Sequence, residues 1–447
     1  MANQVQNLSG IAIGSIEKIN GATDANIEKI NGLEFAGTVD PSTTTLTNHQ
    51  FNGTDSVEHT SICYDPDNEF IIVSYRDADD SNYGKIRAAS ISGTTLTWGT
   101  ETTFSSATTT NTGLCYNTSD NRIMIAWSGP SSNTIYVQAA EVNADKSFDF
   151  ESESASTVDS GGDGGNQSVG YGMIEYNPTY NTATVAYENG GDSGHNYVAA
   201  VSISSGSALD VGTAVEFDDT SEELYGQSYD PDLGKTVLVY DNGTKVGARV
   251  MTQGGTGNRT ITMQTEYLYG TNSGLTIQEY YGGMPVAYDT TLNRHHVLLY
   301  DDAASAAKIV YFVVNSSDYE ITWSSTSASV SSGTASNNET GGGIAYNAAR
   351  NRIITYGATS SATSSDYNFE YHTAAGTAWG GTSGATDGAY TSQGSATIIE
   401  EGLRTRSIHV PSVQVNDGDF ANKTPLVYSD VGGSTGGGRV KLLDAGA

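Results

Sequence analysis

The chain has 447 residues, 52 of them glycine, and its 20 basic and 51 acidic side chains give a net charge of −31. This acid excess argues against a nucleic-acid partner, because binding to phosphates requires clustered Lys and Arg. The chain contains no run of 18 apolar residues, so we expect no insertion into a membrane. A single closed core rarely grows beyond about 250–300 residues, so the length indicates several domains or a modular repeat.

Residues 1–36 differ from the rest of the chain. The run SIEKING at 15–21 returns as NIEKING at 26–32, and Asn-Gly ends both copies. Asn-Gly is a strong signal for the two-residue turn of a β-hairpin, so we expect a small hairpin-like segment. Docking on another protein and packing on the main domain are both open for it. The N-terminus lacks the basic and apolar regions of a secretory signal, so we expect no export by that route.

The IEKING repeat resembles the N-terminal region of structural proteins from marine tailed phages, notably those that infect cyanobacteria. This resemblance implies that residues 1–36 form a docking and assembly segment on a virion. The candidate assembly residues of this segment are Ile16, Ile19, Ile27 and Ile30.

Residues 62–104 contain four short runs in which apolar and polar side chains alternate. The runs are 62–64, 70–75, 83–91 and 96–104, separated by turn residues. A period of two, in runs rich in β-branched and aromatic residues, is typical of β-strands. We therefore expect one antiparallel sheet of four strands here.

The same unit recurs at intervals of 52–60 residues. The first strand of each unit ends in a tyrosine followed by Asp or Asn: Tyr64, Tyr116, Tyr176, Tyr229, Tyr288 and Tyr346. The second strand ends in an aromatic residue: Tyr75, Trp127, Tyr187, Tyr240, Tyr300 and Tyr356. Regular recurrence of one supersecondary unit indicates a repeat architecture. In the sixth unit we expect the fourth strand to begin at Ala378.

A seventh unit ends after its third strand. Its apolar runs are 408–416, a second run ending at Tyr428, and 439–446. The run TTTLTNHQF at 43–51 matches the fourth strand of the first unit, TTLTWGTETTF. We therefore predict an all-β fold, a seven-bladed β-propeller over residues 37–447, in which residues 37–53 supply the closing outer strand of the last blade.

The two faces of such a propeller differ in their loops. The first-to-second-strand loops hardly vary, whereas the second-to-third-strand loops and the interblade connections share the other face and vary widely, the longest at about 387–406. Variable loops on a uniform scaffold favour recognition. Candidate residues that could stack on a sugar or pack against a protein are Tyr83, Tyr171, Tyr225, Tyr280 and Tyr281. The alternative is aromatic cover for the blade edges.

Ionisable residues give weaker signals. Asp77 and Asp80 could collect oxygens around Ca²⁺, but no complete calcium-loop pattern is present, so we expect exposed acidic turns and no cofactor. The pair His295-His296 lies on a predicted strand, where metal ligation is disfavoured. Cys63 and Cys115 are expected to be buried free thiols.

Sequence motifs of catalysis are absent. The chain has no Gly-x-Ser-x-Gly elbow, no phosphate loop and no His-Glu-x-x-His. Leu96–Gly99 and Ile321–Ser324 keep only the Thr-Trp end of the turns found in sialidase-like propellers, and the arginines are scattered. We therefore predict a protein that is not an enzyme.

The blade repeats resemble those of marine phage proteins known as tail fibre or virion structural proteins. This implies a virion structural protein, displayed on the particle, assembled in the host cytoplasm and released by lysis. Its partners would be other virion subunits, through residues 1–36, and a host surface glycan or protein. The alternative is a carbohydrate-binding or carbohydrate-cleaving propeller of bacterial origin. The sequence sets neither the place on the particle, the receptor nor the oligomeric state.

Overall fold

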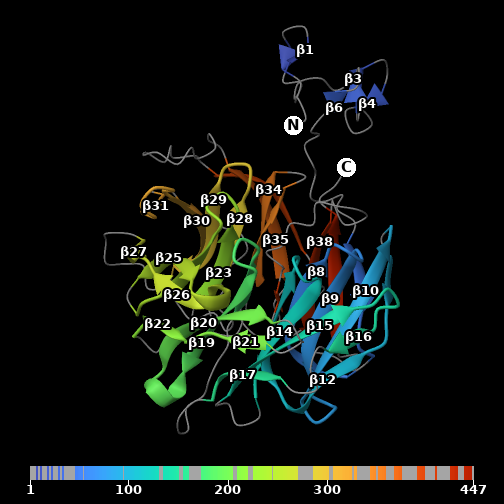
Figure 1. Ribbon diagram of the computed structural model, residues 1–447. Helices are drawn as coiled ribbons and strands as arrows, with labels where there is room; N and C mark the ends of the chain where they lie inside the picture. Colours follow the sequence, from blue (N-terminus) through green and yellow to red (C-terminus); the bar gives the residue numbers. More distant parts are fainter. Residues whose placement is uncertain are drawn as a thin grey trace.

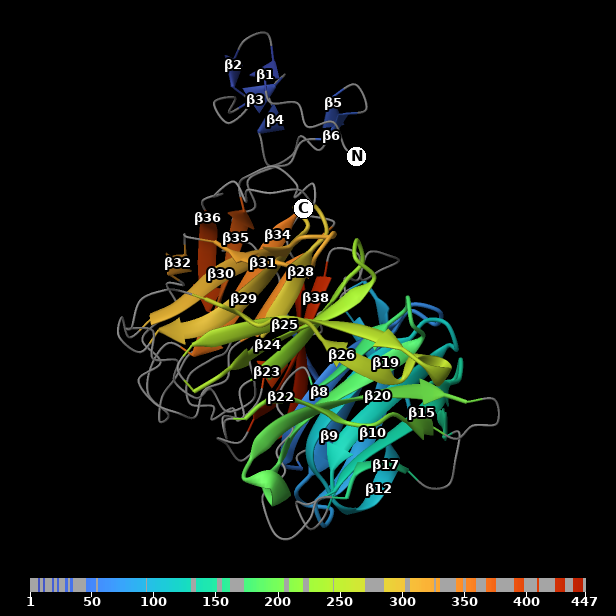
Figure 2. The ribbon, with the colours of Figure 1, turned by 60° about the vertical axis from the view of Figure 1, so that its left-hand side comes forward.

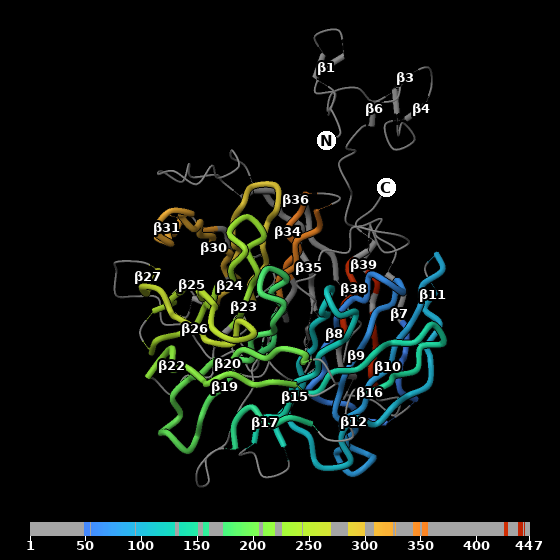
Figure 3. Tube along the Cα trace, viewed as in Figure 1, coloured from blue at the N-terminus to red at the C-terminus, as the bar shows by residue number. Residues whose placement is uncertain are grey.

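The computed structural model consists of β-strands and two single-turn 3-10 helices, η4 (Gly190–Asp192) and η5 (Thr256–Asn258), in the part of the chain that it describes (Figure 3). The described residues are 7–8, 11–12, 18–19, 22–23, 29–30, 33–34, 46–53, 55–93, 95–129, 134–150, 155–160, 173–204, 209–219, 225–243, 245–269, 285–301, 306–324, 327–329, 343–348, 351–358, 367–374, 390–397, 408–409, 423–430 and 437–444.

The N-terminal segment contains three two-stranded hairpins. They are β1 (Asn7–Leu8) with β2 (Ile11–Ala12), β3 (Lys18–Ile19) with β4 (Ala22–Thr23), and β5 (Lys29–Ile30) with β6 (Leu33–Glu34). In sequence, the two Asn-Gly pairs expected to form turns fall between β3 and β4 and between β5 and β6, and they lie outside the described residues. The first hairpin was not predicted, because its turn is Ser-Gly, which is a weaker signal than Asn-Gly.

The first large sheet has its strands in the order β11-β10-β9-β8. These strands are β8 (Val57–Asp65), β9 (Phe70–Asp77), β10 (Tyr83–Ser92) and β11 (Thr95–Trp98), and β12 (Thr102–Thr108) pairs with the other half of β10. The prediction of one continuous strand over 96–104 was therefore wrong. At the break, a Cβ on Gly99 would lie 2.4 Å from the Cβ of Lys146 in the next sheet, so the outer strand bends where the two sheets approach.

Four further sheets repeat this plan with a divided outer strand. The second contains β13 (Thr110–Asn117), β14 (Arg122–Ser128), β15 (Ile135–Val142), β16 (Phe148–Phe150) and β17 (Ser156–Asp159). The third contains β18 (Ile174–Asn177), β19 (Thr182–Asn189), β20 (His195–Ile203), β21 (Leu209–Val211) and β22 (Val215–Asp218). The fourth contains β23 (Tyr225–Asp230), β24 (Lys235–Asp241), β25 (Val246–Gly254), β26 (Thr260–Met263) and β27 (Tyr267–Leu268). The fifth contains β28 (Val286–Asp289), β29 (Arg294–Asp301), β30 (Ala306–Val314), β31 (Ile321–Trp323) and β32 (Ala328–Ser329).

The sixth sheet corrects a second prediction. It contains β33 (Gly343–Asn347), β34 (Arg352–Ala358), β35 (Tyr367–Ala374) and β36 (Tyr390–Thr397). The outer strand was expected to begin at Ala378, and 390–397 was expected to be loop. The run AWGGTSG has three glycines in seven residues, which weakens a strand, whereas β36 pairs with β35 from Asn368↔Thr397 to Ala374↔Tyr390.

The seventh sheet combines both ends of the chain. It contains β37 (Ile408–His409), β38 (Lys423–Asp430), β39 (Gly437–Asp444) and β7 (Leu46–Gln50), in that order. The predicted position of 43–51 beside 440–443 is confirmed in register, because His49 pairs with Val440 and Leu46 with Leu443. The last sheet therefore takes its outer strand from the beginning of the chain.

The apolar cores lie between neighbouring sheets, which stand side by side as the blades of a β-propeller (Figures 1 and 2). Val137 and Val185 belong to the core between the second and third sheets. Val440 and Ile62 belong to the core between the seventh and the first. Each buried Val, Leu or Ile side chain contributes about 1.5–3 kcal/mol.

The turns between first and second strands share one design. The Asp or Asn after the tyrosine accepts hydrogen bonds of 2.8–3.3 Å from the backbone N–H groups two and three residues later; these residues are Asp65, Asn117, Asn177, Asp230 and Asp289. The residue before the second strand has φ between 49° and 63°: Glu69, Asn121, Asn181, Gly234, Asn293 and Asn351. Gly and Asn adopt this left-handed conformation most readily, which explains the uniform loop length.

The repeated tyrosines of the second to sixth sheets bond their own sheet to the turn of the sheet before it. Tyr116 donates its hydroxyl hydrogen to Asp67 Oδ2 at 2.6 Å, and Tyr288 donates to Asp232 Oδ2 at 3.1 Å. Tyr346 donates to Thr291 Oγ1 at 2.6 Å in the same way. The tyrosine at the end of the first strand is therefore a contact between sheets in the second to sixth sheets. Cys63 and Cys115, one residue before two of these tyrosines, are buried free thiols as predicted.

Candidate functional site

The structure brings three of the predicted contact residues together in the turn between β9 and β10. They are Asp77, Asp80 and Tyr83. Tyr225 begins β23 in another sheet. Tyr171, Tyr280 and Tyr281 lie outside the described residues. Of the assembly residues, Ile19 lies in β3 and Ile30 in β5, whereas Ile16 and Ile27 also lie outside the described residues.

Asp77 shapes the turn in which it lies. Its Oδ1 accepts hydrogen bonds of 3.1 Å from the backbone N–H groups of Asp79 and Asp80. Burial raises the pKa of Asp77, and the two N–H groups offset part of that rise. Asn189 and Asp241 cap the corresponding turns of the third and fourth sheets, bonding the N–H groups of residues 191 and 243. One oxygen of Asp77 is therefore used by its own turn.

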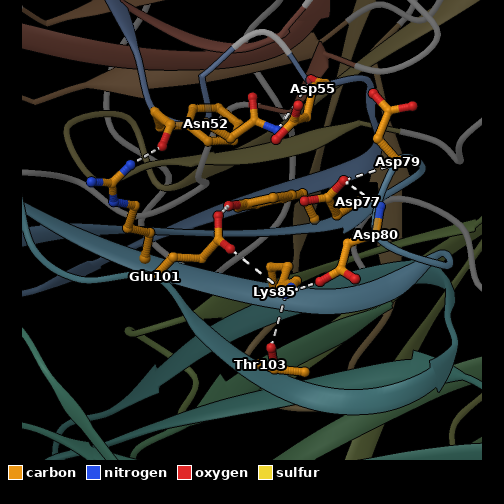
Figure 4. A network of polar contacts seen from close by, with 11 residues as sticks. Asn52, Asp55, Asp77, Asp79, Asp80, Lys85, Glu101 and Thr103 are labelled. Carbon is orange, nitrogen blue, oxygen red and sulfur yellow. Dashed lines mark hydrogen bonds and ion pairs between the residues drawn. The ribbon is translucent and has the colours of Figure 1, made fainter.

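Lys85 is the centre of a polar network beside this turn (Figure 4). Its buried ammonium donates to Asp80 Oδ2 at 2.5 Å and to Thr103 Oγ1 at 3.0 Å, and lies 3.7 Å from Glu101 Oε1. The other oxygen of Glu101 accepts the hydroxyl hydrogen of Tyr75. Burial alone would lower the pKa of Lys85, but the hydrogen bond and charge of Asp80 raise it overall. The ammonium therefore stays charged.

The same network extends to the strand that completes the seventh sheet. Asp79 Oδ2 accepts the Ser56 N–H at 2.7 Å. Asn52 donates its amide to the Asp55 carbonyl at 3.1 Å (Figure 4). Asn52 Oδ1 accepts the Gly438 N–H at 2.7 Å. Arg87 donates to the Phe51 carbonyl and, at 2.7 Å, to the Gly99 carbonyl. The network therefore holds the connection from β7 to β8 against the first sheet.

Sequence reasoning missed Lys85, Arg87 and Glu101. Lys85 and Arg87 stand two residues apart in β10, so they lie on one face of a strand with otherwise small and apolar residues. Two like charges at that spacing were a detectable signal. Glu101, the partner of Lys85, lies in the break of the outer strand, and that break could not be predicted without the contact between the first and second sheets.

The carboxylates around Lys85 are used by hydrogen bonds that hold the fold together. Asp77, Asp79, Asp80 and Glu101 each accept a hydrogen bond from the protein itself. Within the described ranges, no group of three His, Cys, Asp or Glu residues could hold a metal ion. Asp77 and Asp80 therefore gain no calcium ligand set in that part of the chain.

His295 and His296 form two separate buried pairs. His295 Nε2 lies 3.3 Å from Asp230 Oδ2 in the fourth sheet, and His296 Nε2 lies 3.4 Å from Asp289 Oδ2 in the fifth. Adjacent residues of a strand face opposite sides of the sheet, so the two imidazoles do not converge. Burial lowers the pKa of His296. The pKa of Asp289 is also lowered, because the His296 hydrogen bond outweighs the effect of burial.

No protein-family model and no curated protein sequence matches the chain. Among solved structures, a putative 6-phosphogluconolactonase from Bacteroides uniformis is 8% identical, with 69% of this chain and 80% of that chain covered and a TM-score of 0.47. NanB with Optactamide is 8% identical, with coverages of 89% and 70% and a TM-score of 0.46. The β-propeller domain of the trilobed protease from Pyrococcus furiosus is 9% identical, with coverages of 87% and 95% and a TM-score of 0.44. Likenesses of this size carry no argument about activity or ligand.

In the part of the chain that the structure describes, no helix has the length and apolar character needed to cross a bilayer.

Proposed function

We propose that the chain is a non-enzymatic structural protein of a tailed-phage virion. A closed, seven-bladed propeller would be displayed on the particle, and residues 1–36 would attach it to other virion subunits. The phage setting is inferred from the resemblance of the repeats to marine phage proteins. The roles of the two faces, one as scaffold and the other as contact surface, are inferred from their turns.

The ring closure in this proposal is supported by the two chain ends. β7 pairs with β39, and β38 packs against β8 of the first sheet. Phe51, directly after β7, is buried and lies 4.9 Å from the ring of Tyr75. A strand taken from the other end of the chain covers the edge of β39 and gives the last sheet its fourth strand.

The observation that carries the proposal is the contrast between the two faces. On one face the Asp or Asn cap and the left-handed residue recur in turn after turn. On the other face Asp77, Asn189 and Asp241 cap three of the turns between second and third strands, but these connections differ in length and sequence. Function in repeat scaffolds gathers on such variable connections. The carboxylates near Lys85 accept hydrogen bonds from the protein itself. This favours a binding protein over an enzyme that would use these groups as an acid or a base.

Incorporation into particles tests the proposal. Tagged full-length chain and a 37–447 variant would be produced in infected host cells, and purified particles would be probed for the tag. We expect the full chain in particles and the 37–447 variant absent, although both fold with the same melting temperature. Equal incorporation of both, or absence of the full chain from particles, would refute the proposal.

The carbohydrate-binding alternative predicts a different result. Tyr83 lies beside Lys85, whose ammonium is 6.0 Å from the centre of the tyrosine ring, on the variable face. A glycan array with the full chain and a Tyr83→Ala variant would show saturable binding that the variant loses. A blank array removes this alternative.

A further inference from the structure

Asn52 and Gly53 form an Asn-Gly pair in the connection between β7 and β8, where the chain passes from the seventh sheet to the first. The Asn52 side chain is buried, with 4% of its surface exposed. Gly53 has a φ of 26°, and a Cβ built on it would meet no atom within 4 Å. Glycine is therefore favoured here by backbone conformation and not by lack of space. It also leaves the Gly53 nitrogen without a side chain beside it.

An asparagine followed by glycine can undergo deamidation, and asparagine counts among the thermolabile residues. The backbone nitrogen of Gly53 attacks Cγ of Asn52, so that an N–Cγ bond forms and the Cγ–Nδ2 bond breaks. The nitrogen of Gly53 loses its proton, and Nδ2 leaves as ammonia, which gives a succinimide ring. Water then opens the ring at either carbonyl and leaves aspartate or isoaspartate. The reaction therefore requires water alone.

The closed ring holds both ends of the Asn52 amide. Its Oδ1 accepts the N–H of Gly438 in β39 at 2.7 Å, and its Nδ2 donates to the Asp55 carbonyl at 3.1 Å (Figure 4). Deamidation moves Cγ onto the Gly53 nitrogen and expels Nδ2, so both hydrogen bonds oppose it. An amide held in this way reacts after the connection has opened locally.

The product fits the junction less well than asparagine does. Aspartate has no N–H to donate, so its second oxygen faces the Asp55 carbonyl, and one acceptor is left without a donor. It also adds a negative charge at a buried position. The neighbouring cation, Arg87, already donates to the carbonyls of Phe51 and Gly99. Isoaspartate in addition lengthens the backbone of the connection by a methylene group.

We propose that Asn52 is a deamidation site controlled by ring closure. The closed propeller protects Asn52, whereas a chain that opens at the junction between the seventh and first sheets is modified there and closes less readily. Opening then becomes irreversible, because a chemically altered chain leaves the folding equilibrium. The modification occurs whether or not the chain enters a particle.

Asn242 and Gly243 provide an internal reference for this reaction. Asn242 Oδ1 accepts the N–H of Lys245, three residues later, at 3.0 Å in the connection between β24 and β25. This hydrogen bond lies within one turn of the fourth sheet and does not involve the closing strand. The rate of deamidation at Asn242 should therefore not depend on ring closure.

Peptide mapping by mass spectrometry during incubation of the full chain at mildly alkaline pH measures both rates. We expect Asn52 to react at least about tenfold more slowly than Asn242, because its reaction requires local opening. Val440→Ala creates a cavity in the core between the seventh and first sheets. This variant should speed the reaction of Asn52 at least about tenfold and leave that of Asn242 unchanged.

The matched control is Val185→Ala. Val185 is as fully buried as Val440 but belongs to the core between the second and third sheets. Its truncation lowers stability far from the closing strand, so the rates at Asn52 and Asn242 should stay unchanged. Equal acceleration at Asn52 by both valine substitutions would show that the reaction follows global unfolding, and would overturn the inference.

The effect of the product is measured on the modified chain itself. Deamidation adds one negative charge, so ion exchange separates modified from unmodified chain. We expect the modified chain and an Asn52→Asp variant to melt lower than the parent by about 2 °C or more. Asn242→Asp, which keeps the oxygen that accepts the Lys245 N–H, should melt as the parent does.

Three further results would overturn the inference. They are equal rates at Asn52 and Asn242 in the parent chain, an Asn52 that stays unmodified in Val440→Ala while Asn242 reacts, and a modified chain that melts as the parent does. None of these results bears on incorporation into particles, which tests the proposed function separately.

Discussion

Two kinds of junction between sheets hold this propeller together, and they differ in chemistry. The junction between the seventh and first sheets joins distant parts of the chain: Asn52 and Gly438, which bond directly, are 386 residues apart. Its core is apolar and aromatic, with Phe51, Ile62 and Val440 fully or almost fully buried. The junctions among the third, fourth and fifth sheets join segments close in sequence and contain the half-buried Glu175 and the buried Asp230 and His295.

This difference relates the chemistry of a junction to the distance in sequence between the segments that it joins. A contact between distant segments must offset a large loss of chain entropy, which favours apolar burial. Neighbouring segments are held together by the chain itself and can include ionisable groups that cost more to bury. We therefore expect the closing junction to dominate stability and the central junctions to dominate its dependence on pH.

The largest expected effect comes from removing the closing strand. A 52–447 variant lacks β7 and Phe51, so β39 has an open edge and Val440 and Leu442 lose their cover. We expect aggregation or loss of the cooperative transition in calorimetry and size-exclusion chromatography. The 37–447 variant, which keeps β7, should melt as the full chain does. A 52–447 variant that melts cooperatively within a few degrees of it would contradict this assignment.

An intermediate effect is expected at the central junctions. Burial raises the pKa of Glu175 to about 7, although a bond from the Tyr229 N–H lowers it. Folded Glu175 therefore binds more protons than the unfolded chain between about pH 4.5 and 7, and its contribution to stability rises as pH falls. The pKa of His296 is lowered, so below about pH 6.5 the folded chain binds fewer protons there than the unfolded chain does. The contribution of His296 to stability therefore decreases as the pH decreases.

Glu175→Gln separates these opposing contributions. We expect the variant to be more stable than the parent at pH 7 by about 1–3 kcal/mol. It should also lose more of its melting temperature between pH 7 and 5, because the His296 contribution is then unopposed. Thermal melts in steps of pH measure both. Glu141→Gln, which changes an exposed carboxylate, is the matched control. Parallel pH profiles of Glu175→Gln and the parent would show that Glu175 does not titrate as described.

The smallest effect concerns one bond between a tyrosine and a turn. Tyr116→Phe removes the hydroxyl that donates to Asp67 at 2.6 Å and keeps the ring in its core. We expect a loss of about 1 kcal/mol, seen as a lower melting temperature. Tyr83→Phe, a partly exposed tyrosine on the other face, should change nothing. Equal shifts in both variants would remove the proposed role of the repeated tyrosines.

The repeat positions made most of the fold readable from the sequence. The tyrosine followed by Asp or Asn recurs because it serves the same turn and the same contact in successive sheets, so the period of the sequence is the period of the structure. The closing strand was predictable for the same reason: residues 43–51 match the outer strand of the first unit.

The features that the sequence did not predict depend on contacts between residues that do not recur from one repeat to the next. The break in the first outer strand follows from the approach of Lys146 to Gly99. The strand at 390–397 lacks the β-branched run that marks other strands. In the candidate site, Asp77 and Asp80 were found because turns are visible in sequence, whereas Glu101 meets Lys85 only after β10 and the outer strand are paired.

The position of β7 also sets an order of events during synthesis. This strand leaves the ribosome hundreds of residues before β39, the strand with which it pairs. At elongation rates of about 5–20 residues per second, the 386 residues between Asn52 and Gly438 correspond to a delay of roughly 20–80 s. Until β39 is made, β7 lacks its partner strand, and chaperones that shield such segments would raise the yield of folded protein.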